Sequence, residues 1–572
     1  MSKTILVERD VAVPMRDGVT LRADVYRPDT PEPLPLLLQR TMYGKGFSQV
    51  GYALLAAERG YAVVIQDTRG RWASEGENSP FIHEKDDGYD TVEWAARQPW
   101  SNGRVGMFGG SYVGYTQLAA ASAQPPSLKT IAPAITFTDP YSSAYTGGAL
   151  TLGEQVAWVL LALSLMDIQR LPIPNEQKLP LWGQFIALVD GMSSRQTFDR
   201  LPLSSLPLIG QDGLTSSLST ALAHPTEDDL WRLIACPYDR INVPAYHWGG
   251  WYDPFLGNTL RDYAGIREQG NPSQKLMIGP WTHGSFDNAV GEADFGIQAS
   301  AILVLPDELH LRWFDYWLKG VQNGFLDEPP IRIFVMGDNV WRSENEWPLA
   351  RTRYTPYYLH SGGTANSLHG DGGLSLIPPA NEPPDHYTYD PRNPVPTRGG
   401  ALLGWQAALP AGVYDQRTLE ERHDVLVYTT PPLEQDLEVT GPLQVNLWAA
   451  SDAPDTDFTA KLVDVDPSGY ARNLQDGILR ARFRRPGVLA APLVPGEPTS
   501  YSIDLAATSN VFKAGHRIRL EVSSSNFPRF DRNPNTGGLS ADSAELRLAR
   551  QTVLHDSAHP SQLVLPVIPR PG

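Results

Sequence analysis

The most informative segment of the chain is Val105-Gly106-Met107-Phe108-Gly109-Gly110-Ser111-Tyr112-Val113-Gly114. It predicts a buried strand that meets a tight glycine turn, followed by residues 115–121 that can form a helix. Such an elbow exposes a serine hydroxyl above a sheet and turns the next backbone N–H towards a developing oxyanion. The spacing is G-x-S-x-x-G, with Val113 where the commoner G-x-S-x-G motif has its second glycine. We interpret Ser111 as a nucleophile, although a glycine-serine turn after a strand is more often structural.

Working outward from the elbow, short apolar runs without alternation indicate strands that helices cover on both faces. These runs lie at residues 34–38, 61–67, 130–135, 243–248 and 275–278, and residues 86–98 have the apolar stripe of a helix that ends at Pro99. Alternating strands and helices predict an α/β fold with a parallel sheet.

The pattern of the chain predicts three structural units. Residues 1–140 and 238–350 form the two parts of the α/β domain, and the helical stretch 141–237 is inserted between them as a cap. Residues 351–572 contain period-two strands such as 443–447 and 518–522, with Pro and Gly between them. This pattern is typical of an all-β sandwich or jelly roll.

A serine nucleophile needs a base and a carboxylate that orients the base. In this fold class the partners follow in the order acid, then histidine, each just past the end of a strand. Asp253, in the turn 249–254, and His283, in the loop 279–284, fit that order. The alternatives are an Asx-turn for Asp253 and a solvated loop residue for His283.

Two donors are needed for an oxyanion hole. The elbow predicts the Tyr112 N–H as the first. The second is expected from the loop 39–44 after an early strand, where the Tyr43 hydroxyl or a backbone N–H could reach the site. A tyrosine that only packs against the cap is an equal alternative for Tyr43.

Taken together, the chain resembles the bacterial cocaine esterase branch of the CocE/NonD hydrolases, relatives of the X-Pro dipeptidyl-peptidases. The likeness covers nearly the whole chain and is carried by residues 14–18, 60–70, the Ser111 elbow, 251–253, 279–283, 455–462 and 523–528. It implies an α/β-hydrolase domain, an inserted helical cap and a C-terminal jelly roll.

The resemblance also implies roles for individual residues. Ser111 would be the nucleophile, His283 the general base and then acid, and Asp253 its partner, with Tyr43 as an oxyanion donor beside the Tyr112 amide. The implied acyl pocket consists of Phe255, Trp158, Tyr145 and Leu403. Three positions depart from the family pattern, namely Pro254 for a glycine, Tyr145 for a tryptophan and Gly404 for a phenylalanine, so that the shape of the pocket is expected to differ.

Composition excludes several other classes of function. Lys+Arg 47 against Asp+Glu 64 gives a net charge of −17, which repels nucleic acid and anionic lipid surfaces. The single cysteine, Cys236, cannot form an intrachain disulfide, and neither a signal peptide nor a membrane-spanning stretch is visible. We expect a cytoplasmic protein whose ligand is a small-molecule ester and which needs no cofactor or metal. We expect no nucleic-acid or membrane partner, and a homodimer stays open.

Three rival functions stay open. An X-Pro dipeptidyl-peptidase, or an α-amino-acid ester hydrolase or β-lactam acylase, would need carboxylates near the nucleophile to bind an ammonium group. Glu154 and Asp167 are the acids that the sequence offers in the cap. A non-catalytic carbohydrate-binding protein is the alternative outside the hydrolases.

Overall fold

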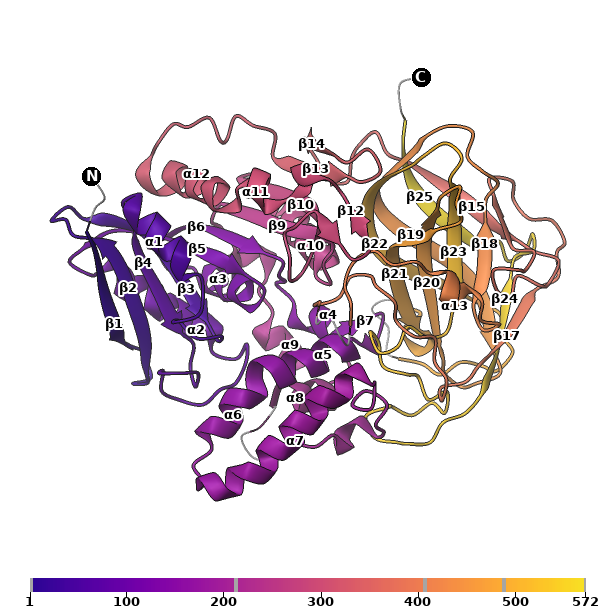
Figure 1. The fold of residues 1–572 in the computed structure, drawn as a ribbon, viewed down its shortest axis with the longest axis horizontal. Helices are drawn as coiled ribbons and strands as arrows, with labels where there is room; N and C mark the ends of the chain where they lie inside the picture. Colours follow the sequence, from indigo (N-terminus) through magenta and orange to yellow (C-terminus); the bar gives the residue numbers. More distant parts are fainter. Residues whose placement is uncertain (1–3, 210–213, 215, 405–408, 486–489, 570–572) are drawn as a thin grey trace.

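A ten-stranded sheet forms the first half of the molecule (Figure 1). The computed structural model describes residues 4–209, 214, 216–404, 409–485 and 490–569. The strands, in sheet order, are β1 (Ile5–Pro14), β2 (Thr20–Pro28), β4 (Ala62–Asp67), β3 (Leu34–Thr41), β5 (Ser101–Gly110), β6 (Leu128–Ala134), β9 (Ala245–Tyr252), β10 (Gln274–Thr282), β13 (Ile331–Val335) and β14 (Val340–Glu344).

The central strands of this sheet are parallel, and its edges are not. Neighbours from β4 to β13 run parallel, whereas β1 and β2 at one edge and β14 at the other pair antiparallel. The predicted parallel sheet is therefore corrected to a mixed sheet with a parallel core. A strand covered on both faces has a continuous apolar run. The edge strand β1 lacks such a run, and much of it is exposed.

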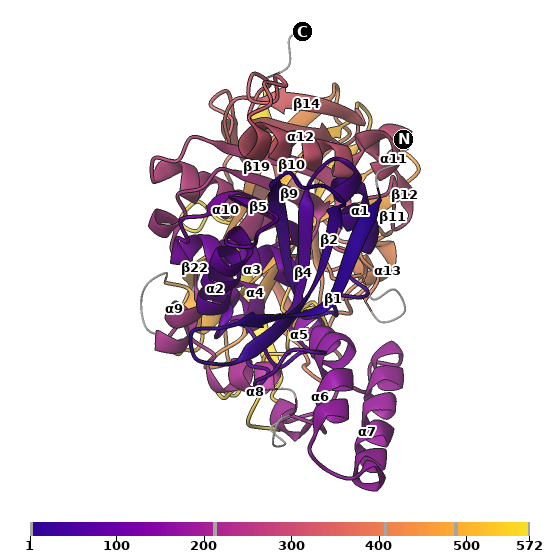
Figure 2. The same cartoon turned by 90° about the vertical axis from the view of Figure 1, so that its left-hand side faces the viewer.

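Helices cover both faces of the parallel core (Figures 1 and 2). One apolar cluster joins the sheet to α2, α3 and α10, and a second joins its other face to α1 and α12. The flanking helices are α1 (Val50–Glu58), α2 (Glu84–Ala96), α3 (Tyr112–Ala123), α10 (Leu256–Glu268), α11 (Ala301–Val304) and α12 (Pro306–Lys319).

A helical segment lies between β6 and β9, which are nevertheless neighbours in the sheet. Its main elements are α4 (Pro140–Ala144), the hairpin β7 (Tyr145–Thr146) and β8 (Ala149–Leu150), α5 (Leu152–Trp158), a π-helical turn (Val159–Ser164), α6 (Leu165–Arg170), α7 (Asn175–Ser193), α8 (Ser216–Ala223) and α9 (Asp229–Ile234). In Figure 2, α6 and α7 extend away from the sheet, whereas α5 stays near it. No helix among the described residues is long and apolar enough to cross a bilayer.

The C-terminal part of the chain is rich in β-structure and packs around its own core. Its elements are β15 (Arg353–His360), β16 (Gly373–Ser375), β17 (Asp385–Tyr389), α13 (Arg417–Glu420), β18 (Leu426–Thr429), β19 (Leu437–Ser451), β20 (Asp457–Val465), β21 (Ala471–Arg480), β22 (Thr499–Phe512), β23 (Arg517–Ser523), β24 (Ala549–Leu554) and β25 (Gln562–Ile568). Buried and exposed side chains alternate in β17, as period-two patterning predicts.

Candidate active site

The serine elbow connects β5 to α3 with Ser111 in a backbone conformation that L-residues rarely adopt, φ 60° and ψ −130°. Gly109 has φ +126°, and a Cβ there would lie 2.4 Å from Val113 Cγ1. A Cβ on Gly114 would lie 2.6 Å from Thr136 Cβ. The segment that follows β6 therefore approaches the elbow most closely at Gly114. This accounts for a glycine at position 114 and a valine at position 113, where the commoner motif has its glycine.

Three side chains predicted as a catalytic set lie within hydrogen-bond distance of one another. His283 Nε2 is 3.0 Å from Ser111 Oγ, and His283 Nδ1 is 2.7 Å from Asp253 Oδ2. The Asp253 side chain is fully buried, and its Oδ1 accepts a 2.7 Å hydrogen bond from the Phe255 N–H. Because an ionised carboxylate only accepts, the Nδ1 atom carries the proton and Nε2 can accept from the serine.

The sheet brings the acid and the base together through its register. Tyr252, the last residue of β9, pairs with Thr282, the last residue of β10, so Asp253 and His283 leave neighbouring parallel strands at the same edge. The elbow leaves β5 at the carboxyl edge of the same sheet. Polar side chains that follow parallel strands therefore converge there.

Tyr43 lies in the loop after β3 and reaches the nucleophile through its hydroxyl. This hydroxyl lies close to the Ser111 side chain and accepts a 3.2 Å hydrogen bond from Trp158 Nε1. Burial raises the pKa of Tyr43, which keeps the hydroxyl protonated and able to donate. The same loop is held by Arg71, whose Nε donates to the Met42 carbonyl at 3.3 Å.

Arg71 also explains how the π-helical turn is tolerated. Its Nη2 donates to the carbonyl of Ala162 at 2.7 Å, and its Nη1 donates to Asp167 Oδ1 at 2.9 Å. A π-helical turn disturbs the regular backbone hydrogen bonding of a helix. Arg71 satisfies one of its carbonyls and ties it to the Tyr43 loop, a role that the sequence did not indicate.

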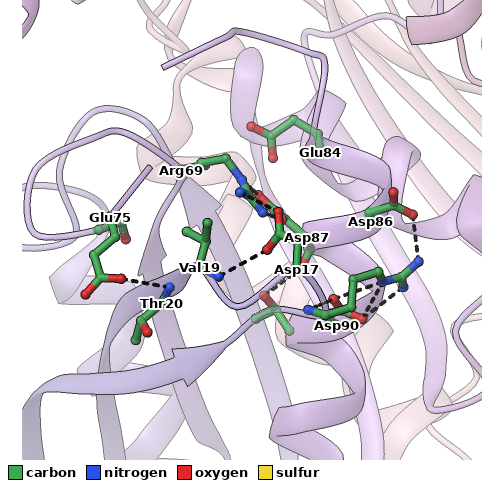
Figure 3. A network of polar contacts seen from close by, with 12 residues as sticks. Asp17, Val19, Thr20, Arg69, Glu75, Glu84, Asp86, Asp87 and Asp90 are labelled. Atoms are coloured by element: carbon green, nitrogen blue, oxygen red, sulfur yellow. Dashed lines mark hydrogen bonds and ion pairs between the residues drawn. The ribbon is translucent and has the colours of Figure 1, made fainter. Parts of the chain in front are cut away.

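Tyr112 is the first residue of α3, and its side chain holds the turn in place. An N–H in the first turn of a helix has no acceptor within that helix. The Tyr112 hydroxyl donates to Glu84 Oε1 at 2.8 Å, and Glu84 Oε2 is 2.6 Å from Arg40 Nη1. Figure 3 shows Glu84 close to the neighbouring network at the start of α2, where Arg69 binds Asp87.

A cavity of about 260 Å³ opens beside the nucleophile. It is lined by Ser79, Pro80, Phe81, Ile82, Ser111, Tyr112, Phe137, Pro140, Ser143, Ala144, Glu154, Gln155, Trp158, Ser217, Thr220, Ala221, His224, Leu230, Trp231, Ile234, Phe255 and Leu403. Aromatic rings dominate the wall around Ser111. Trp158 stacks on Tyr112 at 6.1 Å between centroids, and Phe255 meets His283 edge-on at 5.2 Å.

The structure places the predicted pocket residues differently. Phe255, Trp158 and Leu403 line the cavity, whereas Tyr145 lies behind its wall and donates from its hydroxyl to the carbonyl of Ala221 at 2.8 Å. Lining residues that the sequence did not indicate include Phe81, from the loop before α2, and Trp231, from α9. Neither carries a motif, so only the folded chain reveals them. Among the described residues, no group of three or more metal-binding side chains occurs.

Comparisons with known proteins cover nearly the whole chain. Residues 17–285 match the family model described as X-Pro dipeptidyl-peptidase (S15 family), and residues 323–564 match that of the X-Pro dipeptidyl-peptidase C-terminal non-catalytic domain. The cocaine esterase of Rhodococcus sp. (strain MB1 Bresler) is 40% identical over 577 residues, covering 99% of each chain.

Two solved structures are similar along the whole chain. An α-amino acid ester hydrolase shares 26% identity with a TM-score of 0.79, covering 99% of this chain and 97% of that one. An aminopeptidase from a marine sediment archaeon, Thaumarchaeota archaeon, shares 26% identity with a TM-score of 0.80, covering 100% and 97%.

Proposed function

The chain belongs to the CocE/NonD hydrolases, the relatives of cocaine esterase within the S15 family, and from this premise we propose that it hydrolyses carboxylic esters with an aromatic or short acyl group. It has an α/β-hydrolase-like fold with a C-terminal β-rich domain. The observation that carries the proposal is the relay from Ser111 through His283 to Asp253, at 3.0 and 2.7 Å, beside an aromatic cavity.

In the first half of the proposed reaction, Ser111 Oγ attacks the ester carbonyl carbon while His283 Nε2 takes the hydroxyl proton. The oxyanion of the tetrahedral intermediate accepts hydrogen bonds from the Tyr112 N–H and the Tyr43 hydroxyl. The carbon–oxygen bond to the alcohol then breaks, and His283 returns its proton to the leaving alkoxide. The acyl group remains on Ser111.

In the second half, His283 takes a proton from water, whose oxygen attacks the acyl-enzyme. Breakdown of the second intermediate returns the proton to Ser111 and releases the acid. Asp253 keeps the imidazole in the required tautomer and stabilises its cationic form. Phe255, Trp158 and Leu403 would contact the acyl group, because they line the cavity beside the nucleophile.

The domain organisation follows from the same reading. We assign residues 1–140 and 238–350 to the hydrolase domain, 141–237 to a helical cap and 351–572 to a jelly roll. The cap assignment is supported by its position between neighbouring strands β6 and β9 and by its share of the cavity wall. The largely antiparallel pairing of the C-terminal strands supports the jelly roll.

A peptidase that releases X-Pro dipeptides is the second candidate, favoured by the names of both matching family models. Comparing turnover of 4-nitrophenyl butyrate, a 4-nitrophenyl benzoate and Gly-Pro-4-nitroanilide separates the two functions. The ester proposal expects turnover of the first two and little release from the anilide.

The nucleophile is tested by covalent labelling. An aryl organophosphonate should add one phosphonyl group to the protein and abolish ester hydrolysis, and Ser111→Ala should neither turn over esters nor be labelled. Ser143→Ala, which changes another serine of the same cavity, serves as the matched control and should behave as the wild type. Stoichiometric labelling of Ser111→Ala, read by intact mass, would refute the assignment.

A further inference from the structure

Glu154 is the carboxylate in the wall of the cavity beside Ser111. Its residue is only 4% exposed, and both carboxylate oxygens lack a hydrogen-bond partner among the described residues. Burying a carboxyl group without a hydrogen-bond partner lowers the stability of the fold, and no hydrogen bond from a described residue offsets this cost here. The relay described above does not use it.

The position of Glu154 on α5 relates it to the reacting atoms. Trp158 stands four residues further along the helix, so both side chains share one face, about 6 Å apart along the axis. Trp158 donates to the Tyr43 hydroxyl and stacks on Tyr112. Glu154 is therefore one helical turn from the residue that covers the nucleophile.

The charges around Glu154 leave its carboxylate without a counter-ion of its own. Arg529 is the nearby cation, but it ion-pairs with Asp476, which also accepts from Asn526 Nδ2 at 2.6 Å. The pKa of Glu154 is raised to about 8, chiefly by burial. The charge of Arg529 acts to lower it, and the charge of Asp476 adds a smaller increase.

The other charged groups of the site are engaged elsewhere. The lining residue His224 pairs with Asp228 at 2.5 Å, and His283, beside the cavity, belongs to the relay. Asp167, the other acid expected in this segment, binds Arg71.

We propose that Glu154 is a specificity-determining residue that binds a primary ammonium group on the acyl part of the ester. The inference rests on the proposed esterase function and names its substrate class. The ammonium group supplies the charge and the donors that the buried carboxylate lacks. The aromatic wall accommodates the apolar body of the same acyl group.

The test compares esters that differ only in an ammonium group. One pair is methyl 4-(aminomethyl)benzoate and methyl 4-ethylbenzoate, with the nitrogen far from the carbonyl. The other is phenylglycine methyl ester and methyl 2-phenylpropanoate, with the nitrogen on the α-carbon. For the wild type, Glu154→Gln and Glu154→Leu, the ratio of kcat/KM within each pair is measured.

In at least one pair, the wild type should prefer the amine, and Glu154→Gln should lower that preference about 10-fold or more. Glu154→Leu should retain turnover of the apolar esters. The pair whose ratio changes in Glu154→Gln shows at which distance from the ester carbonyl Glu154 binds the nitrogen. Glu176→Gln, which removes an exposed carboxylate on α7 outside the cavity wall, is the matched control and should leave both ratios unchanged.

The pH profile gives an independent readout. Binding a cation needs the ionised carboxylate and a protonated amine. With the 4-(aminomethyl)benzoate pair, whose amine stays protonated in this range, the preference for the amine should therefore rise between about pH 6 and pH 8 in the wild type and stay flat in Glu154→Gln. Steps that are common to both esters of a pair cancel in the ratio.

The two proposals fail in distinguishable ways. Ratios unchanged in Glu154→Gln, with both esters still hydrolysed in a Ser111-dependent manner, would overturn the role of Glu154. Absence of any Ser111-dependent hydrolysis would overturn the esterase function itself.

Discussion

The Tyr43 hydroxyl lies close to Ser111 and accepts a hydrogen bond from the Trp158 indole before any substrate is bound. An oxyanion donor prearranged in this way stabilises charge without reorganising during the reaction. Tyr43→Phe should therefore lower kcat about 100-fold to 1000-fold with a small change in KM. Steady-state kinetics with 4-nitrophenyl butyrate measures the effect, and Tyr141→Phe, near the same cavity, is the control. Turnover within twofold of the wild type would remove Tyr43 from the mechanism.

Glu154 also makes a prediction about stability. Its folded-state pKa of about 8 lies above the ordinary value of 4.5, so between these values the folded protein holds a proton that the unfolded chain releases. The free energy of unfolding contributed by this group should fall by up to about 1.4 kcal/mol per pH unit as pH rises through that window. Glu154→Gln should lack this component and gain stability relative to the wild type from pH 5 to pH 8. Urea unfolding at several pH values checks it, and parallel pH curves for both proteins would contradict it.

For single residues, the sequence predicts the position of a side chain well when that residue directly follows a strand. It predicts poorly which residues line a cavity. Ser111, Asp253 and His283 were expected together because each follows an apolar run, and the structure places them within hydrogen-bond distance. Glu154 and Asp167 could not be told apart, because the π-helical turn between them shifts the helical phase. Their roles, like those of the relay, stay predictions.

At the scale of elements, the elbow is the most constrained part of the hydrolase sheet. Gly109 has φ +126°, and a Cβ at this position would lie only 2.4 Å from Val113 Cγ1. Gly109→Ala should therefore cost about 3 kcal/mol or more, because backbone strain and overlap add. Gly103, also on β5, has φ +82° and open space around it, so Gly103→Ala should cost only about 1 kcal/mol. Urea unfolding followed by tryptophan fluorescence compares them, and equal midpoints would contradict the steric account.

The sequence predicts the core strands and misses the edges for a physical reason. Strands β3, β4 and β10 are buried along their whole length, and each contains a short apolar run that the sequence shows. By contrast, β1 is largely exposed and β14 only partly buried, so neither carries that signal. The hairpin β7–β8 has two residues in each strand, which is too short for any periodicity.

At the scale of the whole molecule, the β-rich domain anchors the helix that carries Glu154 and Trp158. Asp531 Oδ1 accepts from the Leu150 N–H and from Arg480 Nη2, both at 2.8 Å. Arg480 N–H donates to the Gly147 carbonyl, also at 2.8 Å. The hairpin that precedes α5 is thus fastened to β21.

Breaking this anchor should affect both stability and substrate binding. Removing one partner of a buried ion pair costs about 3–5 kcal/mol, so Asp531→Ala should unfold at lower temperature and raise KM for aromatic esters. Thermal melting and steady-state kinetics measure the two effects. Asp542→Ala, an exposed site nearby, should change neither. A variant with lowered melting temperature but wild-type KM would show that α5 does not depend on this anchor.

The hydrogen bond from the Trp158 indole to the Tyr43 hydroxyl has an evolutionary consequence. Under the proposed mechanism, a mutation that enlarges the cavity by replacing the tryptophan with a smaller residue also removes the hydrogen bond that positions the Tyr43 hydroxyl, so that broader substrate scope and fast turnover oppose each other. Relatives that acquire new ester substrates without losing turnover should therefore vary other lining residues, such as Trp231 and Leu403, and keep the indole.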